Sequence, residues 1–293
     1  MAAETLQLSL LDVVIQVTAE RHVLAPLRHR FASCIVESGM PAIVLDIFGR
    51  GPPFRLRCGP REIEAPLPEA WPSLSALVQA LIMQERPGLH FLHAAAVARN
   101  GQATLLCGPS TSGKSTLATG LREGGWVGLC DDCAPVNIER RQVLPFWTTP
   151  GRCHVTRHQP RHTPPPATLC QVVFLVPVGG RPVPGETLQQ AAARWKLFRG
   201  LLRHSTSWKA RGNTLSLRGP GDFSGPPRLS ACAPADAVRQ WMQFSMSPVP
   251  SLGTAFARMQ LLFPHCHFHR LEPGSLAATL DLLESQACEE VPG

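Results

Sequence analysis

Apolar positions along this chain follow two spacings, one typical of strands and one typical of helices. Short apolar runs at residues 11–17 (LDVVIQV) and 41–48 (PAIVLDIF) indicate strands, and Pro and Gly interrupt the pattern after the second run. In residues 74–85, apolar residues recur every three or four positions, which predicts a helix. We therefore predict a small α+β module over residues 1–87.

The remainder of the chain, residues 88–293, alternates strand and helix patterns. The run QVVFLVPV at 171–178 indicates another buried strand, and residues 267–285 indicate a strand, a turn and a closing helix. These patterns predict a second domain of the α/β class.

A β-hairpin is predicted within residues 91–108 (FLHAAAVARNGQATLLCG), where two apolar runs flank Asn100 and Gly101. Both residues accept the positive φ that a type I′ turn requires. A two-residue turn also fixes the register of the two strands. On that register His93 lies opposite Gly108, so turn geometry alone brings His93 to the segment that follows the hairpin.

That segment, which we call the 108–115 loop, reads GPSTSGKS and fits the phosphate-binding pattern G-x-x-x-x-G-K-[ST]. It follows the strand pattern ATLLC and opens the helix pattern KSTLATGLRE, as this motif requires. Small residues let backbone N–H groups surround phosphate oxygens, and a helix N-terminus adds partial positive charge. Lys114 would reach the β- and γ-phosphates, and the Ser115 hydroxyl would bind Mg²⁺. The predicted nucleotide-binding residues are Gly108, Pro109, Ser110, Thr111, Ser112, Gly113, Lys114, Ser115 and Thr116.

A pair of acidic residues, Asp131 and Asp132, follows the next strand pattern, WVGLC. The helix after the loop would be ~15 Å long, and the strand would return ~16 Å. Because the outward and return paths cancel, both carboxylates are predicted to emerge beside the loop, at the carboxyl ends of the strands. One could serve the metal and the other could take a proton from an incoming hydroxyl. We name Ser115 and Asp131 as candidate Mg²⁺ ligands, although the sequence leaves open which aspartate is the base, and a solvated turn is the structural alternative.

Composition narrows the class of protein. The net charge of +7 suits an acidic ligand such as a nucleotide, but Lys and Arg are scattered and Tyr is absent, which argues against a nucleic-acid partner. The segment MAAETLQLSL lacks the basic start of a signal peptide, and no stretch of 18 apolar residues occurs. We expect a cytoplasmic protein without a membrane partner, whose ten Cys are reduced thiols.

Two further groups could bind a metal, but simpler interpretations are favoured. Cys130 and Cys133 flank the aspartates, and without a second Cys pair at zinc-site spacing they are expected to pack as small residues. On a strand, His265, His267 and His269 would share one face. A surface strand is the favoured interpretation, since no carboxylate ligand lies near in sequence.

Residues 91–136 resemble the HPr kinase/phosphorylase family and its related kinases. In that family a His-bearing strand, a hairpin, a phosphate loop, a helix and a strand ending in DD follow in this order; here they read LHAAAV, RNG, GPSTSGKST, LATGLREGG and WVGLCDD. The resemblance implies an HPr kinase-type P-loop kinase domain over residues 88–293, which uses ATP and Mg²⁺ to phosphorylate a serine hydroxyl. The residues that match the family's active site are His93, Lys114, Ser115, Asp131 and Asp132.

The chain departs from that family at two points. Thr116 stands where HPr kinases usually have Glu, and the Gly- and Arg-rich signature linked to the phosphorylase reaction has no counterpart. Relatives without this signature include kinases that modify the C-terminal residue of lasso-peptide precursors, so a serine of a peptide or protein is the expected acceptor. The N-terminal module could present that substrate, and a homo-oligomer is compatible with the sequence. The alternatives are a small-molecule kinase of the same fold and a nucleotide-sensing or ATP-hydrolysing regulator without an acceptor.

Overall fold

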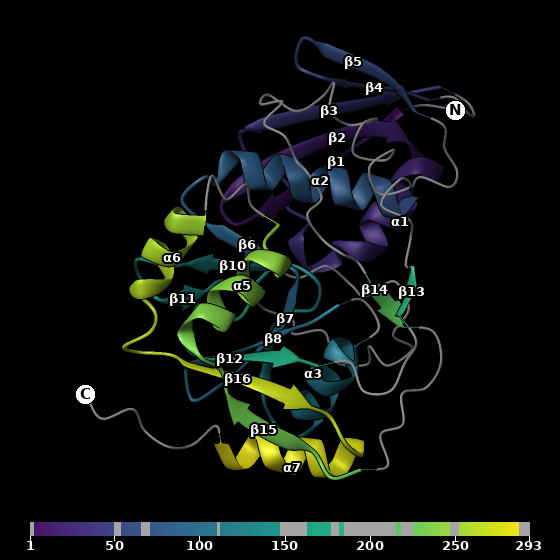
Figure 1. Cartoon of the computed structure of the whole chain (residues 1–293). Helices are drawn as coiled ribbons and strands as arrows, with labels where there is room; N and C mark the ends of the chain where they lie inside the picture. Colours follow the sequence, from purple (N-terminus) through teal and green to yellow (C-terminus); the bar gives the residue numbers. More distant parts are fainter. Residues whose placement is uncertain are drawn as a thin grey trace. The chain divides into compact units, whose positions relative to one another are not determined.

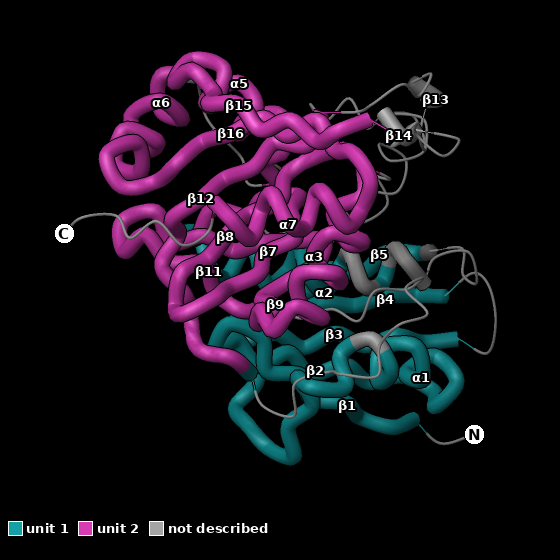
Figure 2. Tube along the Cα trace, turned by 90° about the horizontal axis from the view of Figure 1, so that it is seen from below, with its two compact units in different colours: residues 1–87, 147–163, 189–209 teal, residues 88–146, 164–188, 210–293 magenta. Residues whose placement is uncertain are grey.

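The chain is a mixed α/β protein (Figure 1). The computed structural model describes residues 3–49, 54–65, 71–109, 112–146, 163–176, 182–184, 215–217, 225–246 and 252–286. Two compact units can be distinguished: the first is built on residues 1–87, and the second begins at Gly88 (Figure 2). Within the described residues, no helix has the length and apolar character needed to cross a membrane.

The first unit contains a five-stranded sheet and two helices. Its strands lie in chain order: β1 (Ala3–Leu10), β2 (Val13–Glu20), β3 (Ile43–Phe48), β4 (Phe54–Cys58) and β5 (Arg61–Ala65). Neighbouring strands are antiparallel except β2 and β3, which are parallel. Helix α1 (Arg21–Arg30) contacts β1, β2 and α2 (Trp71–Glu85), and the short 3-10 helix η1 spans Ala32–Cys34.

Alternating burial explains the sheet of the first unit. Every second residue of β2, starting at Val13, is buried, so one face of the strand joins the core. The predicted strands at 11–17 and 41–48 and the predicted helix at 74–85 are confirmed as β2, β3 and α2. Hairpin β4–β5 lies in the segment where Pro and Gly predicted only an interruption; Gly59 supplies its turn with a φ of 58°.

The second unit is organised around a nine-stranded sheet. Seven strands follow the order β6-β10-β11-β12-β8-β7-β9, while β16 pairs with β12 and with β15. Their bounds are β6 (His90–Leu92), β7 (Ala94–Arg99), β8 (Gln102–Cys107), β9 (Val127–Cys130), β10 (Ala134–Asn137), β11 (Gln142–Val143), β12 (Ala167–Leu175), β15 (Arg228–Ala231) and β16 (His267–Glu272). A separate pair is formed by β13 (Pro182–Pro184) and β14 (Leu215–Leu217).

Four helices complete the described part of the second unit: α3 (Lys114–Glu123), α5 (Pro234–Phe244), α6 (Leu252–Gln260) and α7 (Leu276–Gln286). The predicted buried strand and the predicted C-terminal strand and helix are confirmed as β12, β16 and α7. Helices α3 and α7 pack against each other and share a core with the sheet. Gly120 allows this approach, because a Cβ there would lie 2.6 Å from Leu280 Cδ1.

The hairpin β7–β8 connects the core to the 108–115 loop. Asn100 and Gly101 have φ values of 52° and 77°, as the predicted type I′ turn requires. The two strands pair from Arg99 opposite Gln102 at the turn, in the predicted register. The position of the far end of the hairpin is therefore fixed by the turn.

Candidate functional site

The far end of hairpin β7–β8 brings His93 to the start of the 108–115 loop. The last pair of the ladder is Ala94 with Cys107, so His93 and Gly108 are the next residues on the two chains. The backbone N–H of His93 donates instead to Phe244 O (2.8 Å), which ends the pairing with β8. His93 thus lies where the hairpin opens toward the loop, as the sequence predicted.

Backbone pairing is also interrupted on the side of His93 that faces β9 and β10. Strands β6 and β7 flank His93 and run antiparallel to β10 and β9, which flank residues 131–133. Pairing stops after Ala96 with Cys130 and resumes at Leu92 with Ala134. The two interruptions therefore face each other, and the acidic pair is delivered to the gap in which His93 lies.

Strand β9 does not pair with β8, because β7 lies between them. Both β8 and β9 are antiparallel to β7, so their carboxyl ends share one edge of the sheet. Two strand spacings separate them, about 10 Å. The predicted return of Asp131 and Asp132 to the edge of the loop is confirmed, and His93, directly before the intervening strand, lies between the aspartates and the loop.

The 108–115 loop has the backbone features of an anion cradle. Gly113 adopts a φ of 95° at the N-cap of α3, and none of the described side chains caps this helix, so its first N–H groups are available to a ligand. A Cβ at Gly108 would lie 2.5 Å from Ser112 Oγ. Ser110 and Thr111 lie outside the described residues, and Thr116 is exposed in the first turn of α3.

Two observations indicate that an anion would fit this loop. The side-chain oxygen of Ser112 is buried and has no hydrogen-bond partner among the described residues. A helix N-terminus directly follows a glycine-rich turn, which is the arrangement in which backbone N–H groups bind phosphate.

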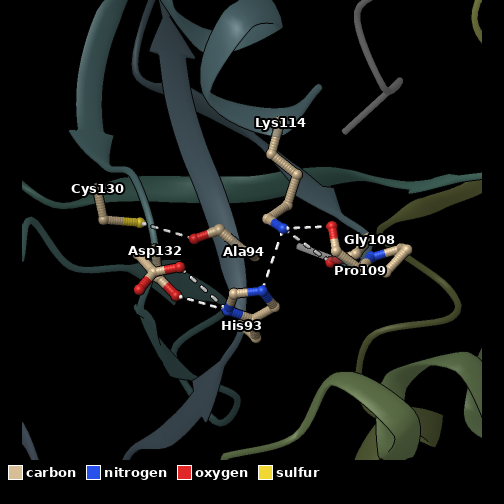
Figure 3. A network of polar contacts seen from close by, with 7 residues as sticks. All are labelled: His93, Ala94, Gly108, Pro109, Lys114, Cys130 and Asp132. Atoms are coloured by element: carbon tan, nitrogen blue, oxygen red, sulfur yellow. Dashed lines mark hydrogen bonds and ion pairs between the residues drawn. The ribbon is translucent and has the colours of Figure 1, made fainter. Parts of the chain in front are cut away.

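Lys114, the first residue of α3, is buried beneath the loop (Figure 3). Its Nζ atom donates to Gly108 O (2.8 Å) and Pro109 O (2.9 Å), and lies 3.1 Å from His93 Nε2. Burial lowers the pKa of Lys114, while the negative charge of Asp132 acts in the opposite direction. The lysine is thus held by two loop carbonyls and one imidazole.

His93 connects the lysine to the acidic pair (Figure 3). Because an ammonium group has only donors, His93 Nε2 must accept from Lys114, and the ring proton resides on Nδ1. Nδ1 lies 3.2 Å from both the backbone oxygen and the Oδ1 atom of Asp132. Lys114, His93 and Asp132 therefore form a continuous hydrogen-bonded chain.

The two aspartates have different surroundings. Asp131 accepts a hydrogen bond from the side chain of Ser115, and it is less exposed than Asp132, whose side chain is 54% exposed. Burial raises the pKa of Asp131, opposed by the Ser115 hydrogen bond and by the charges of Lys114 and Arg122. Asp131 therefore faces Ser115, whereas Asp132 faces His93 and solvent.

The sequence did not predict that Arg122 influences the site. Arg122 lies in the last turn of α3, and its charge acts on Asp131. No motif identifies this effect, because it depends on how α3 folds against β9.

The two cysteines beside the aspartates are packing residues. Cys130 and Cys133 are buried, and burial raises the pKa of both thiols, so they remain protonated. Cys130 Sγ lies 3.8 Å from Ala94 O. No group of three metal-ligating side chains occurs among the described residues, and β16 begins only at His267, so His265 is outside the strand face predicted for the three histidines.

The chain matches no model of a known protein family and no curated protein. The functional conclusion therefore depends on the geometry of the site.

Proposed function

We propose that this chain is an ATP- and Mg²⁺-dependent kinase that transfers the γ-phosphoryl group to a serine hydroxyl of a peptide or protein. The second unit would then be a P-loop kinase domain of HPr kinase type. The observation that carries the proposal is the chain Lys114–His93–Asp132, which joins the 108–115 loop to a partly exposed carboxylate.

The residues of the loop suit the phosphates of a nucleotide. Lys114 is already directed at the loop carbonyls of Gly108 and Pro109, so a phosphate oxygen that enters the loop would compete for the same three ammonium hydrogens. The N-terminus of α3 adds N–H donors and partial positive charge.

Mg²⁺ would be held by Ser115 and Asp131, because hydroxyl and carboxylate oxygens are its preferred protein ligands and these two side chains already contact each other. When bound, the ion would neutralise charge that develops on the phosphate oxygens. Asp131 would then be a metal ligand, and Asp132 would be the carboxylate that accepts a proton.

Asp132 suits the role of general base. Its side chain is 54% exposed, so a serine hydroxyl from outside the molecule can reach it, and its Oδ1 atom lies 3.2 Å from Nδ1 of His93, which also contacts the backbone oxygen of Asp132. The serine O–H proton would pass to the Asp132 carboxylate as the serine oxygen forms a bond to the γ-phosphorus. The bond between that phosphorus and the bridging oxygen would break, ADP would leave with the electron pair, and Lys114 would stabilise the charge.

The exposure of Asp132 favours a large acceptor, since a base in a closed pocket would admit only small molecules. The precursor of a ribosomal peptide of the lasso type, phosphorylated on a C-terminal serine, is the specific substrate proposed. A small-molecule kinase and a nucleotide-hydrolysing regulator without an acceptor are the competing functions.

One experiment separates these functions. The full chain is incubated with γ-labelled ATP and Mg²⁺, first with peptides that end in Ser or Ala and then with free hydroxyl metabolites, and the products are identified by mass spectrometry. The proposal expects phosphate on Ser-ending peptides and none on Ala-ending controls, with the signal lost in Lys114→Ala and Asp132→Asn. Labelled metabolites would indicate the small-molecule kinase, and release of inorganic phosphate alone would indicate the regulator.

A further inference from the structure

A row of polar side chains crosses the sheet of the second unit far from the 108–115 loop. Thr104 on β8 pairs with Gln171 on β12, which in turn pairs with His267 on β16. Because side chains alternate along strands, Thr104 and Gln171 share a face with Leu106 and Val173, two residues further on. The side chains of Leu106 and Val173 belong to the core beneath α3 and α7. The apolar face of the sheet thus becomes polar toward the amino ends of its strands.

The polar row lines a cavity of about 80 Å³. Its other walls include Arg99 at the hairpin turn, Trp126 before β9 and His269 on β16. A cavity of this volume has room for several water-sized groups. It is therefore large enough for a small anion.

Three residues that line the cavity bury polar groups, and one of these groups has no hydrogen-bond partner among the described residues. Thr104 and Gln171 are 4% and 6% exposed, and Thr104 Oγ1 donates to Gln171 Oε1 (3.1 Å). Trp126 is 5% exposed, and its indole Nε1 has no acceptor among the described residues. Since burying an unpaired donor is costly, the Trp126 N–H group indicates that a polar ligand or water completes the site.

The formal charge among the described residues that line the cavity is positive. None of the described residues that line it is Asp or Glu, while Arg99 contributes a guanidinium group and His267 and His269 contribute imidazole rings. Burial and then the neighbouring His267 lower the pKa of His269, which favours its neutral form, so Arg99 supplies the positive charge. A guanidinium fork matches the geometry of a carboxylate or a phosphate.

We propose that this cavity is a second ligand site, which binds a small metabolite through its carboxylate or phosphate oxygens. Arg99 provides the charge, and Thr104, Gln171 and the two imidazoles provide the hydrogen bonds. The site lies at the turn end of hairpin β7–β8, whereas His93 and Gly108 lie at the other end. Arg99 is six residues from His93 and Thr104 is four from Gly108, about 20 Å and 13 Å at 3.3 Å each, so the ligand is distinct from the nucleotide.

The test uses the full chain with Lys114→Ala, which weakens anion binding by the 108–115 loop. Inorganic phosphate and malonate are titrated separately, and the indole N–H resonance of Trp126, assigned with Trp126→Phe, is followed by NMR. We expect a saturable shift in wild type and Lys114→Ala alike. A response to phosphate alone indicates a phosphate ester as the natural ligand, and a response to malonate alone or to both indicates a carboxylate-binding site.

Substitutions in the cavity complete the test. Arg99→Gln, at an exposed position that should not affect folding, is expected to weaken binding about tenfold. Gln171→Glu, nearly isosteric but negatively charged, should weaken it at least as much. Arg239→Gln on α5, which does not line the cavity, is the matched control and should bind normally. The proposal is overturned if neither probe shifts the Trp126 signal, or if Arg99→Gln binds as tightly as wild type.

Discussion

The Nε2 atom of His93 lies 3.1 Å from the Nζ atom of Lys114, and this contact determines which ring nitrogen of His93 carries the proton. An ammonium group only donates, so the ring accepts on that side and presents its N–H to Asp132. The lysine thereby fixes the tautomer of a histidine that orients a carboxylate. A single hydrogen-bonded chain links the residue expected at the phosphates to the residue expected at the acceptor.

Amide substitutions at His93 can separate its two contacts. Asn places a donor near Nδ1, where it can still orient Asp132, whereas Gln places a polar group near Nε2, beside Lys114. We expect His93→Ala to lower kcat about 10- to 100-fold, as loss of a residue that orients a reacting group does. His93→Asn should recover more kcat than His93→Gln, which would mainly restore KM for ATP. Steady-state kinetics and Tm measure this, and a fall in Tm with unchanged kcat would show a structural role only.

The two aspartates should give different phenotypes. Asp131→Asn is expected to raise the Mg²⁺ concentration needed for half-maximal activity, because an amide is a weaker ligand than a carboxylate. Asp132→Asn should lower kcat by about 10²–10⁴-fold at saturating Mg²⁺, because it removes the proton acceptor. Mg²⁺ titrations of both variants check this assignment; the reverse pattern would exchange the two roles.

Gly108→Ala should damage the loop without affecting the fold elsewhere. The new Cβ would lie 2.5 Å from Ser112 Oγ and 3.0 Å from the Cβ of Leu175, so the loop must shift, at a cost of about 1–3 kcal/mol. We expect at least tenfold weaker nucleotide binding by calorimetry. Gly88→Ala is the control, since its Cβ would meet nothing within 4 Å. Normal nucleotide binding by Gly108→Ala would exclude this loop as the phosphate site.

His90 should make the protein less stable in mild acid. This buried imidazole accepts hydrogen bonds from Trp241 Nε1 (2.9 Å) and Ser245, and burial lowers its pKa from 6.5 to about 3. The unfolded chain binds a proton below about 6.5, whereas the folded chain does not, so stability is full above that pH and falls as pH drops toward 3. The expected loss is about 1.4 kcal/mol per pH unit in this window.

Urea unfolding of wild type and His90→Gln between pH 7 and 5 measures this effect. The quantity to compare is the slope of unfolding free energy against pH, because other histidines also titrate and the substitution itself disturbs Trp241. Equal slopes would mean that His90 is protonated in the folded protein.

Much of the candidate site followed from local rules. The type I′ turn at Asn100 and Gly101 fixed the hairpin register, and the register fixed the place of His93. The glycine pattern and the strand and helix around it located the 108–115 loop. Matching lengths of α3 and β9 returned the aspartates to the same edge of the sheet, because rises per residue are constant in regular elements.

Interactions between near neighbours in the sequence set the turns and regular elements, and these bring the site residues together at this end of the sheet. The contacts of each residue depend instead on the folded arrangement. Strand β7 separates β8 from β9, Asp132 faces His93 while Asp131 faces Ser115, and a polar row crosses the sheet toward the amino ends of its strands. Strand order and side-chain contacts arise from packing between segments distant in sequence. No local pattern predicts that packing, because many strand orders satisfy the same hydrophobic periodicity.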